Sequence, residues 1–255
     1  MGFWTYRHAV TVLPAFAILL VVAVIMRLLL KGRSYEIRML PIKIIAVLLI
    51  LLEIGKQAYS ISIGYTFFRL PFHFCSIFLY VLPFMAFYRG KGWKNLCSIA
   101  SATMLGLFIG MLVMPGCIYS EEVYDALFSN YLYFHTVAFH HLVVFAFFIT
   151  FFLDLHKPTG RGGELLFVVM FSVGFVAVSC TMAYVLDTNF SQFLYSTVTP
   201  IENLAAKIEA AVGTELMNVI YTSCCAALHI IFITGMNYLF LLLCVFKSKL
   251  TKKVI

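Results

Sequence analysis

The sequence predicts an all-α protein that crosses a lipid bilayer several times. Of its 255 residues, 63% are hydrophobic and 11% are charged, and the mean hydropathy is +0.99. A soluble domain carries about 25% charged residues. The apolar residues also fall into runs of about 20, which is the length that a helix needs to cross the hydrocarbon core of a bilayer. These three observations exclude a soluble fold.

Seven apolar runs follow one another along the chain, and we expect each to be a transmembrane α-helix. Backbone groups in lipid have to bond within the protein, and the runs lack the alternation of barrel strands. The first run is too long for a cleavable signal peptide, so it is expected to remain as a span. We expect one seven-helix domain over residues 1–255, with spans at His8–Leu30, Pro41–Ile63, Pro71–Tyr88, Asn95–Met114, Asn130–Leu153, Leu165–Leu186 and Met217–Phe246.

Lysine and arginine indicate the orientation of such a bundle, because cytoplasmic loops carry an excess of both. One side has only Arg7, Arg69 and Lys207, while Lys56 falls inside a span. The other side has fourteen basic residues, namely Arg27, Lys31, Arg33, Arg38, Lys43, Arg89, Lys91, Lys94, Lys157, Arg161, Lys247, Lys249, Lys252 and Lys253. We therefore expect the amino terminus outside and the carboxyl terminus in the cytoplasm.

The net charge of +7 does not indicate nucleic-acid binding. The basic residues lie in short segments between apolar runs, where they determine topology. All the cysteines except Cys117 lie within or at the edge of these runs, so we expect buried thiols and not a disulfide framework. Membrane phospholipids are the expected partners, and the sequence does not indicate an oligomeric state.

One outer connection, residues 187–216, is too long for a plain turn. Its segment Thr199-Pro200-Ile201-Glu202 combines an N-cap, a proline at the first helical position and a glutamate three residues after the cap, which are helix-start signals. Apolar residues then repeat at helical spacing, at Ile201, Leu204, Ala205, Ile208 and Val212. We expect an amphipathic helix at the outer interface, which is either a lid over a lipid site or a tether.

Ionisable residues inside a span cost about 2.5–3.5 kcal/mol to insert, so each of them needs a partner or a function. On the expected topology they share one layer in the outer half of the bundle, formed by Glu53, His73, Cys75, His135, His140, Cys225 and His229. Glu53 with Lys56 and Gln57 forms either a local ion pair that neutralises itself or a charge that orients a histidine or holds a headgroup.

The fifth span carries His135, His140 and His141. At 100° per residue, His135 and His140 diverge by about 140°, so the three rings cannot all face one cavity. They lack the i, i+4 spacing of a helical zinc motif, and no acidic residue lies among them. We expect neither a metal ion nor another cofactor.

Cys75 is the candidate nucleophile. With Pro71 at the first position of the third span, Cys75 would lie about one turn inside a helix amino terminus, where the dipole favours the thiolate. The alternative is an inert packing cysteine, and a cationic neighbour would decide between the two. His73 does not share its helix face, so the base should come from another helix. Cys225 and His229 form a rival pair, or polar contacts between helices.

Four segments together resemble the YwaF-type integral membrane family, whose eukaryotic relatives include a transmembrane ether-phospholipid acyltransferase. They are Glu53-Ile54-Gly55-Lys56, Leu70-Pro71-Phe72-His73-Phe74-Cys75-Ser76, His140 late in the fifth helix, and Thr188-Asn189-Phe190 after the sixth. The chain departs from the family pattern at His141, where a glycine is expected, and at Phe190, where a tyrosine is expected. The resemblance covers about two thirds of the chain.

The resemblance implies seven helices and the transfer of fatty acyl chains between lipids through a cysteine thioester. Cys75 becomes the nucleophile and His140 the base, and the supporting or substrate-binding residues are His73, Glu53, Asn189 and His135. The alternative is a non-catalytic lipid-binding, transport or envelope-support protein with the same polar layer. The resemblance favours a bacterial cell membrane, whereas the terminal Lys252-Lys253-Val254-Ile255 resembles a retrieval tail and leaves the endoplasmic reticulum as the alternative.

Overall fold

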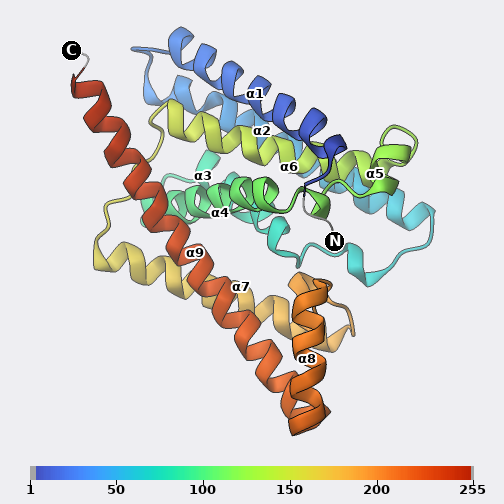
Figure 1. Cartoon of the computed structure of the whole chain (residues 1–255). Coiled ribbons are helices and arrows are strands. Elements are labelled where there is room, and N and C mark those ends of the chain that lie inside the picture. Colours follow the sequence, from blue (N-terminus) through green and yellow to red (C-terminus); the bar gives the residue numbers. More distant parts are fainter. Residues whose placement is uncertain (1–3, 254–255) are drawn as a thin grey trace.

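The structure is a computed structural model that describes residues 4–253 (Figure 1). These residues form helices joined by turns and loops, and they contain no strand. The last two residues of the suggested retrieval tail lie outside the described part of the chain. The α-helices are α1 (Tyr6–Leu29), α2 (Tyr35–Ser62), α3 (Phe78–Phe87), α4 (Trp93–Val113), α5 (Glu121–Ala126), α6 (Tyr131–Phe152), α7 (Gly162–Val185), α8 (Thr199–Val212) and α9 (Thr214–Lys253).

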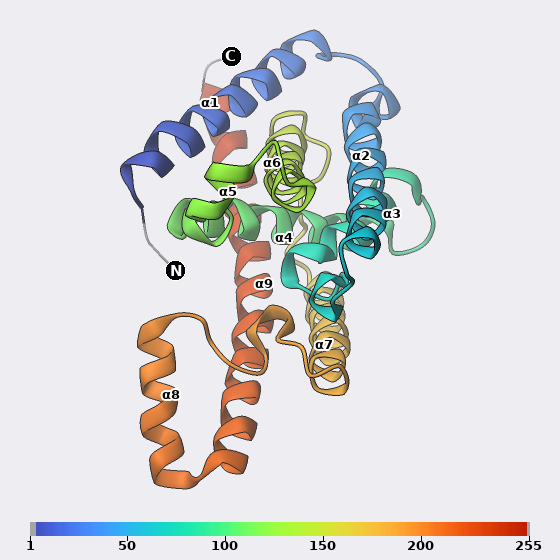
Figure 2. The ribbon, with the colours of Figure 1, turned by 90° about the vertical axis from the view of Figure 1, so that its right-hand side faces the viewer.

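Helix α4 lies at the centre of the molecule, where it packs against α3, α6, α7 and α9 (Figure 2). Every residue from Cys97 to Leu107 is buried. Small side chains in this stretch let neighbouring helices approach closely, which is how helices associate where lipid removes the hydrophobic driving force. A Cβ atom at Gly106 would lie 2.7 Å from the ring of Phe232 on α9, so a larger residue would have to displace this ring.

Large apolar side chains are exposed along the outer faces of the helices, as expected where lipid replaces water. Five of the described helices are long and apolar enough to cross a membrane: α1, α4, α6, α7 and residues Thr214–Leu250 of α9. The all-helical membrane architecture is therefore confirmed. Helix α2 carries charged residues within its apolar stretch, and α3 has only 10 residues. The count of seven spans and the orientation of the termini remain predictions.

The predicted start of the third span is wrong. Pro71 lies in no helix, because Leu70 before it is extended, as residues before proline usually are. The chain bends at Pro71, where the Phe72 amide donates to the Leu70 carbonyl at 2.9 Å, and Cys75 lies in a 3₁₀ turn, η2 (Phe74–Ile77), that leads into α3. Cys75 is therefore not one turn inside an α-helix, and the dipole argument for its reactivity does not apply.

Other boundaries also differ from the prediction, and α9 runs to Lys253 instead of ending at Phe246. Helix α2 begins before Pro41, at Tyr35, because the Ser34 side chain accepts a hydrogen bond from the Ile37 amide and caps the helix. Helix α8 forms where the amphipathic helix was predicted, but Val198 is at its N-cap and makes no side-chain cap. No residue of α8 is buried. Its location at the membrane interface stays a prediction.

Candidate functional site

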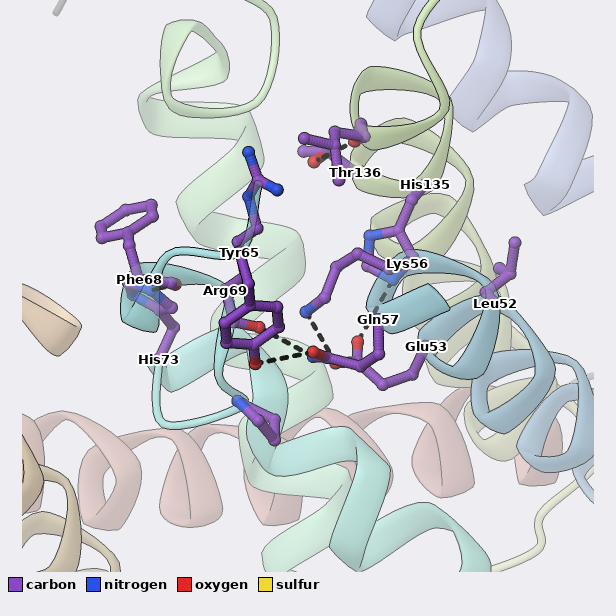
Figure 3. Close-up of polar contacts among 12 residues, drawn as sticks. Leu52, Glu53, Lys56, Gln57, Tyr65, Phe68, Arg69, His73, His135 and Thr136 are labelled. Carbon is purple, nitrogen blue, oxygen red and sulfur yellow. Dashed lines mark hydrogen bonds and ion pairs between the residues drawn. The ribbon is translucent and has the colours of Figure 1, made fainter. Parts of the chain in front are cut away.

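A group of charged and polar side chains forms on the last turns of α2, and we call Glu53, Lys56, Gln57 and His135 the Glu53 cluster (Figure 3). The Lys56 ammonium lies 2.7 Å from one carboxylate oxygen of Glu53, and both side chains are only 13% exposed. The Gln57 amide donates to the same oxygen at 2.6 Å. The local ion pair expected from the sequence is therefore present.

The same carboxylate also faces a histidine on a neighbouring helix. His135 Nε2 lies 3.3 Å from the second oxygen of Glu53, although the two atoms are not aligned for a hydrogen bond. Helices α2 and α6 come this close because Gly55 has no side chain: a Cβ atom there would lie 2.2 Å from the hydroxyl of Tyr131. That hydroxyl donates to the Leu52 carbonyl at 3.3 Å. Glu53 therefore pairs with Lys56 and also lies close to His135, and its role stays a prediction.

The loop after α2 is tied back onto this cluster, which the sequence analysis missed. The Tyr65 hydroxyl donates to the Gln57 side chain at 2.8 Å, and the Gln57 amide donates to the Arg69 carbonyl at 2.9 Å. The Arg69 guanidinium donates to the Ser60 and Gly64 carbonyls. These residues lie between two apolar segments, and their polarity was the available signal.

His73 connects this loop to the segment after α7. Its Nε2 lies 2.9 Å from the Phe68 carbonyl oxygen, which can only accept, so Nε2 carries the proton. Its Nδ1 then accepts from the Ser191 amide at 3.5 Å. Phe190 is fully buried, and its ring centroid lies 5.2 Å from that of His73. Two of the segments that carry the family resemblance therefore contact each other.

Asn189 organises the turn that it begins. Its side-chain amide donates to the Tyr195 carbonyl at 2.9 Å, and its oxygen accepts from the Leu194 amide at 3.0 Å. An open pocket of about 520 Å³ lies between this turn and the loop after α2, and it is lined by Tyr65, Thr66, Phe67, Phe68, Leu186, Asp187, Thr188, Asn189 and Tyr195. The Asn189 donor is therefore already bonded to the protein, although the residue borders a cavity.

Cys75 is partly buried, and both members of the Lys56 and Glu53 ion pair lie within electrostatic range of its sulfur. His140, the expected base, is buried on α6, where its Nδ1 donates to the Thr136 carbonyl at 2.6 Å. That bond leaves Nε2 as the nitrogen with a lone pair. Within residues 4–253, no hydrogen bond joins Cys75 to His140.

The rival pair on α9 is also held in contact. Cys225 Sγ lies 3.9 Å from His229 Nδ1, as the helical spacing predicts. The same nitrogen donates to the Cys225 carbonyl at 2.8 Å, so it is not available to take the thiol proton. Among the described residues, no group of His, Cys, Asp and Glu side chains is arranged to hold a metal ion.

Comparison with known proteins identifies the family of this chain. The TMEM164 family model matches residues 3–207. The chain belongs to the TMEM164 family. No curated protein and no solved structure matches the chain. The matched region contains the Glu53 cluster, Cys75, His140 and Asn189, whereas α9 with its Cys225 and His229 pair lies outside it. Membership agrees with the apolar helices in making this an integral membrane protein. The YwaF-type likeness stays a prediction.

Proposed function

We propose that this TMEM164 family protein is a membrane lipid acyltransferase in which Cys75 forms an acyl thioester. The observation that supports the proposal is that Cys75 lies within electrostatic range of the Lys56 and Glu53 ion pair, which brings a cation near the sulfur together with its counter-charge. An ammonium beside a cysteine stabilises the thiolate, which is the nucleophilic form. Cys75 also lies in a 3₁₀ turn next to polar residues, unlike a cysteine that packs within an apolar helix.

The reaction proceeds in two balanced steps. His140 takes the thiol proton, and the Cys75 thiolate attacks the ester carbonyl of a donor lipid. The C–O bond of that ester breaks, and the departing lipid oxygen takes the proton from the imidazolium. In the second step His140 takes the proton of an acceptor lipid hydroxyl, whose oxygen attacks the thioester and restores the thiol. Burial in a bilayer keeps water from competing with the acceptor.

The other site residues act by positioning. Glu53 holds the Lys56 ammonium on one oxygen and faces His135 with the other. The hydrogen-bond donors of His73 and Asn189 are bonded to backbone carbonyls, so we propose that these residues shape the loops around the site. Phospholipids are the proposed donor and acceptor, and we place the protein in a bacterial cell membrane, with the endoplasmic reticulum as the alternative.

A second candidate function is non-catalytic binding or transport of a lipid. The observation that favours it is the open pocket of about 520 Å³ beside Asn189, which is large enough for a polar headgroup. In this case the Glu53 cluster is a self-neutralised polar contact, and Cys75 only fills space. The two functions differ in their requirement for sulfur at position 75, because a binding site tolerates serine there and a thioester mechanism does not.

The test is intact mass spectrometry of the purified protein in phospholipid nanodiscs. We expect an acyl adduct that hydroxylamine removes and that is absent from Cys75→Ser. Cys225→Ser is the matched control, because it removes another partly buried thiol and should leave the adduct in place. His140→Gln should slow adduct formation. If no adduct forms with several lipid classes while Cys75→Ser supports normal cellular function, catalysis is excluded and the binding function stands.

A further inference from the structure

A second pocket lies at the opposite end of the helices from the Glu53 cluster. It has a volume of about 630 Å³ and opens where α4 and α7 begin. We call it the basic pocket, and it is lined by Tyr35, Trp93, Lys94, Asn95, Asp154, Leu155, His156, Lys157, Thr159, Arg161, Gly163 and Glu164. Figure 1 shows the loop between α6 and α7 on the same side as the carboxyl end of α9, away from α8.

The cations of this pocket are not neutralised by the acids beside them. Lys94, Lys157 and Arg161 form no ion pair with any acid among the described residues. The Asp154 carboxylate is instead engaged by Lys247 at 2.8 Å and by Arg27 at 3.6 Å.

The second acid of the pocket, Glu164, accepts hydrogen bonds from uncharged donors. One of its oxygens accepts from Ser98 at 2.6 Å, and the other accepts from the Thr159 amide at 2.7 Å. These neutral donors leave Glu164 its negative charge, whereas Asp154 is compensated by Lys247 and Arg27, so the three cations of the pocket outnumber its one uncompensated acid.

The backbone adds to this positive field. Lys94 and Asn95 lie in the first turn of α4, and Arg161 is the N-cap of α7, so two long helices point their amino termini at one cavity. Unbonded N–H groups and the helix dipole make such ends favourable for anions. Gly160, with a φ of +69°, makes the turn that places Arg161 here, and a Cβ atom at Gly160 would lie 2.9 Å from Leu241.

One wall of the pocket is aromatic. The rings of Tyr35 and Trp93 meet edge to face, with centroids 5.7 Å apart, and their polar atoms are already used: the Tyr35 hydroxyl donates to the Leu155 carbonyl, and the Trp93 indole to the Met85 carbonyl. The cavity therefore offers an apolar surface next to its cations. A phosphate alone would leave most of about 630 Å³ empty.

We propose that the basic pocket binds a phosphate group carried on a larger molecule, through Lys94, Lys157, Arg161 and the amino termini of α4 and α7. The phosphate comes from a phospholipid headgroup or from a soluble phosphate ester, and the chemistry of recognition is the same for both. This site is separate from Cys75, so it does not depend on the proposed acyl transfer.

The excess of basic residues expected on a cytoplasmic face does not account for this arrangement. Lys31, Arg33 and Lys249 are exposed near the same end of the helices, yet none of them lines the cavity. A topology signal requires charge on one side of the membrane and does not require a cavity, two helix amino termini and engaged acids at one place. Lys31, Arg33 and Lys249 therefore provide a charge-matched control for the three cations of the basic pocket.

The experiment measures the midpoint temperature of unfolding of the delipidated full chain in neutral detergent, at constant ionic strength. The probes are phosphatidic acid against diacylglycerol, and glycerol 3-phosphate against glycerol, so each pair differs only by the phosphate. At a hundredfold excess over Kd we expect a rise of roughly 5 °C or more with a phosphate probe. The rise should disappear in the triple variant Lys94→Gln, Lys157→Gln, Arg161→Gln and persist in Lys31→Gln, Arg33→Gln, Lys249→Gln.

The outcomes of this experiment identify the source of the phosphate and test the proposal itself. A rise with phosphatidic acid alone supports the proposal with a lipid source, and a rise with glycerol 3-phosphate supports it with a soluble one. Arg161→Lys should retain the response, and Lys157→Gln, which changes only a loop residue, should weaken it even if the triple variant does not fold. No rise with either probe, or an equal loss in both triple variants, would overturn the proposal.

Discussion

The two ends of the helical bundle differ in how far their charged side chains are compensated within the protein. In the Glu53 cluster, the buried carboxylate of Glu53 meets Lys56, Gln57 and His135, so its charge is compensated inside the protein. In the basic pocket, Asp154 is paired with Lys247, and Lys94, Lys157 and Arg161 form no ion pair and outnumber the remaining acid, Glu164. One end is complete without a ligand, whereas the other is not.

This difference teaches how charge can be used in a membrane protein. A buried charge needs compensation, since its desolvation costs several kcal/mol. A cation exposed to water needs no compensating charge from the protein, so it remains available to bind an external anion. The Glu53 cluster therefore suits a preorganised site that works on an uncharged group such as an ester, and the basic pocket suits recognition of an anion.

Labelling tests whether the two ends lie on opposite faces of the membrane, with an all-or-none expected result. Cys117, exposed in the 3₁₀ turn after α4, should react with an impermeant thiol reagent added to intact cells. Lys31→Cys in a Cys117→Ser background should react only after permeabilisation. The reverse pattern would invert the predicted orientation, and labelling of both in intact cells would contradict any topology that separates the two ends.

Removing the central charge of the Glu53 cluster should cause the largest loss of stability. Glu53→Gln leaves the Lys56 ammonium buried without its counter-charge, so we expect a loss of about 3 kcal/mol or more in the free energy of unfolding. Chemical unfolding in mixed micelles measures it. Glu36→Gln is the control, because Glu36 pairs with Lys43 and Arg89 but is 58% exposed, and it should change little. Equal effects would show that the Glu53 cluster is not buried as described.

The packing of α4, which separates the two ends, should be sensitive to one methyl group. Gly106→Ala places a Cβ atom 2.7 Å from Phe232, so we expect a loss of about 1–3 kcal/mol in the free energy of unfolding by the same assay. Gly110 is four residues away on the same helix and has no neighbouring atom within 4 Å of its Cβ position. Gly110→Ala should therefore not destabilise the protein. A harmless Gly106→Ala would contradict the close crossing of α4 and α9.

His156, which lines the basic pocket, should make the free energy of unfolding depend on pH. Burial lowers the pKa of His156, in the loop between α6 and α7, to about 4, while Glu164 opposes this shift and Lys94 adds to it. Because the folded-state pKa lies below the ordinary value of about 6.5, the neutral form stabilises the fold at higher pH. This contribution is complete above pH 6.5 and is lost as the pH falls toward 4.

Between pH 7 and pH 5.5 the expected loss is about 1 kcal/mol of the free energy of unfolding. His156→Gln keeps a donor for the Ser98 hydroxyl, which lies 2.7 Å from His156 Nε2, and removes the titration. The variant should therefore show a flatter dependence of stability on pH over this range. If the slope of the free energy of unfolding against pH were the same in His156→Gln, the pKa of His156 would be unperturbed and its ring would be accessible to water.

The sequence predicted the membrane architecture and most helices well, because the length of each apolar run matches the thickness of the hydrocarbon core of a bilayer. Helical spacing also indicated that Glu53 could reach Lys56 and that Cys225 and His229 share a helix face, and both pairs are in contact. It was wrong about the start of the third span. There, Pro71 fits a helix start locally, but the segment is bent, and His73 is bonded to Phe68 in the same loop and to Ser191 in the segment after α7.

The basic pocket could not be predicted for a similar reason. Lys94, Lys157 and Arg161 read as topology signals along the chain, and only the fold brings the amino termini of α4 and α7 together. The position of Lys56 beside Cys75 likewise depends on how the loop after α2 returns to that helix.

The length of α9 has a mechanical consequence. Its 40 residues measure about 60 Å at 1.5 Å per residue, against a hydrocarbon core of about 30 Å. A helix that is too long for a bilayer is accommodated by tilting, and the tilt is set by its packing against neighbouring helices. Lys247 fixes one end of α9 to Asp154 at the end of α6, while α8 packs beside its first turns (Figure 2). Because α9 also packs along α4 and α7, any change in its tilt would have to move these two helices with it.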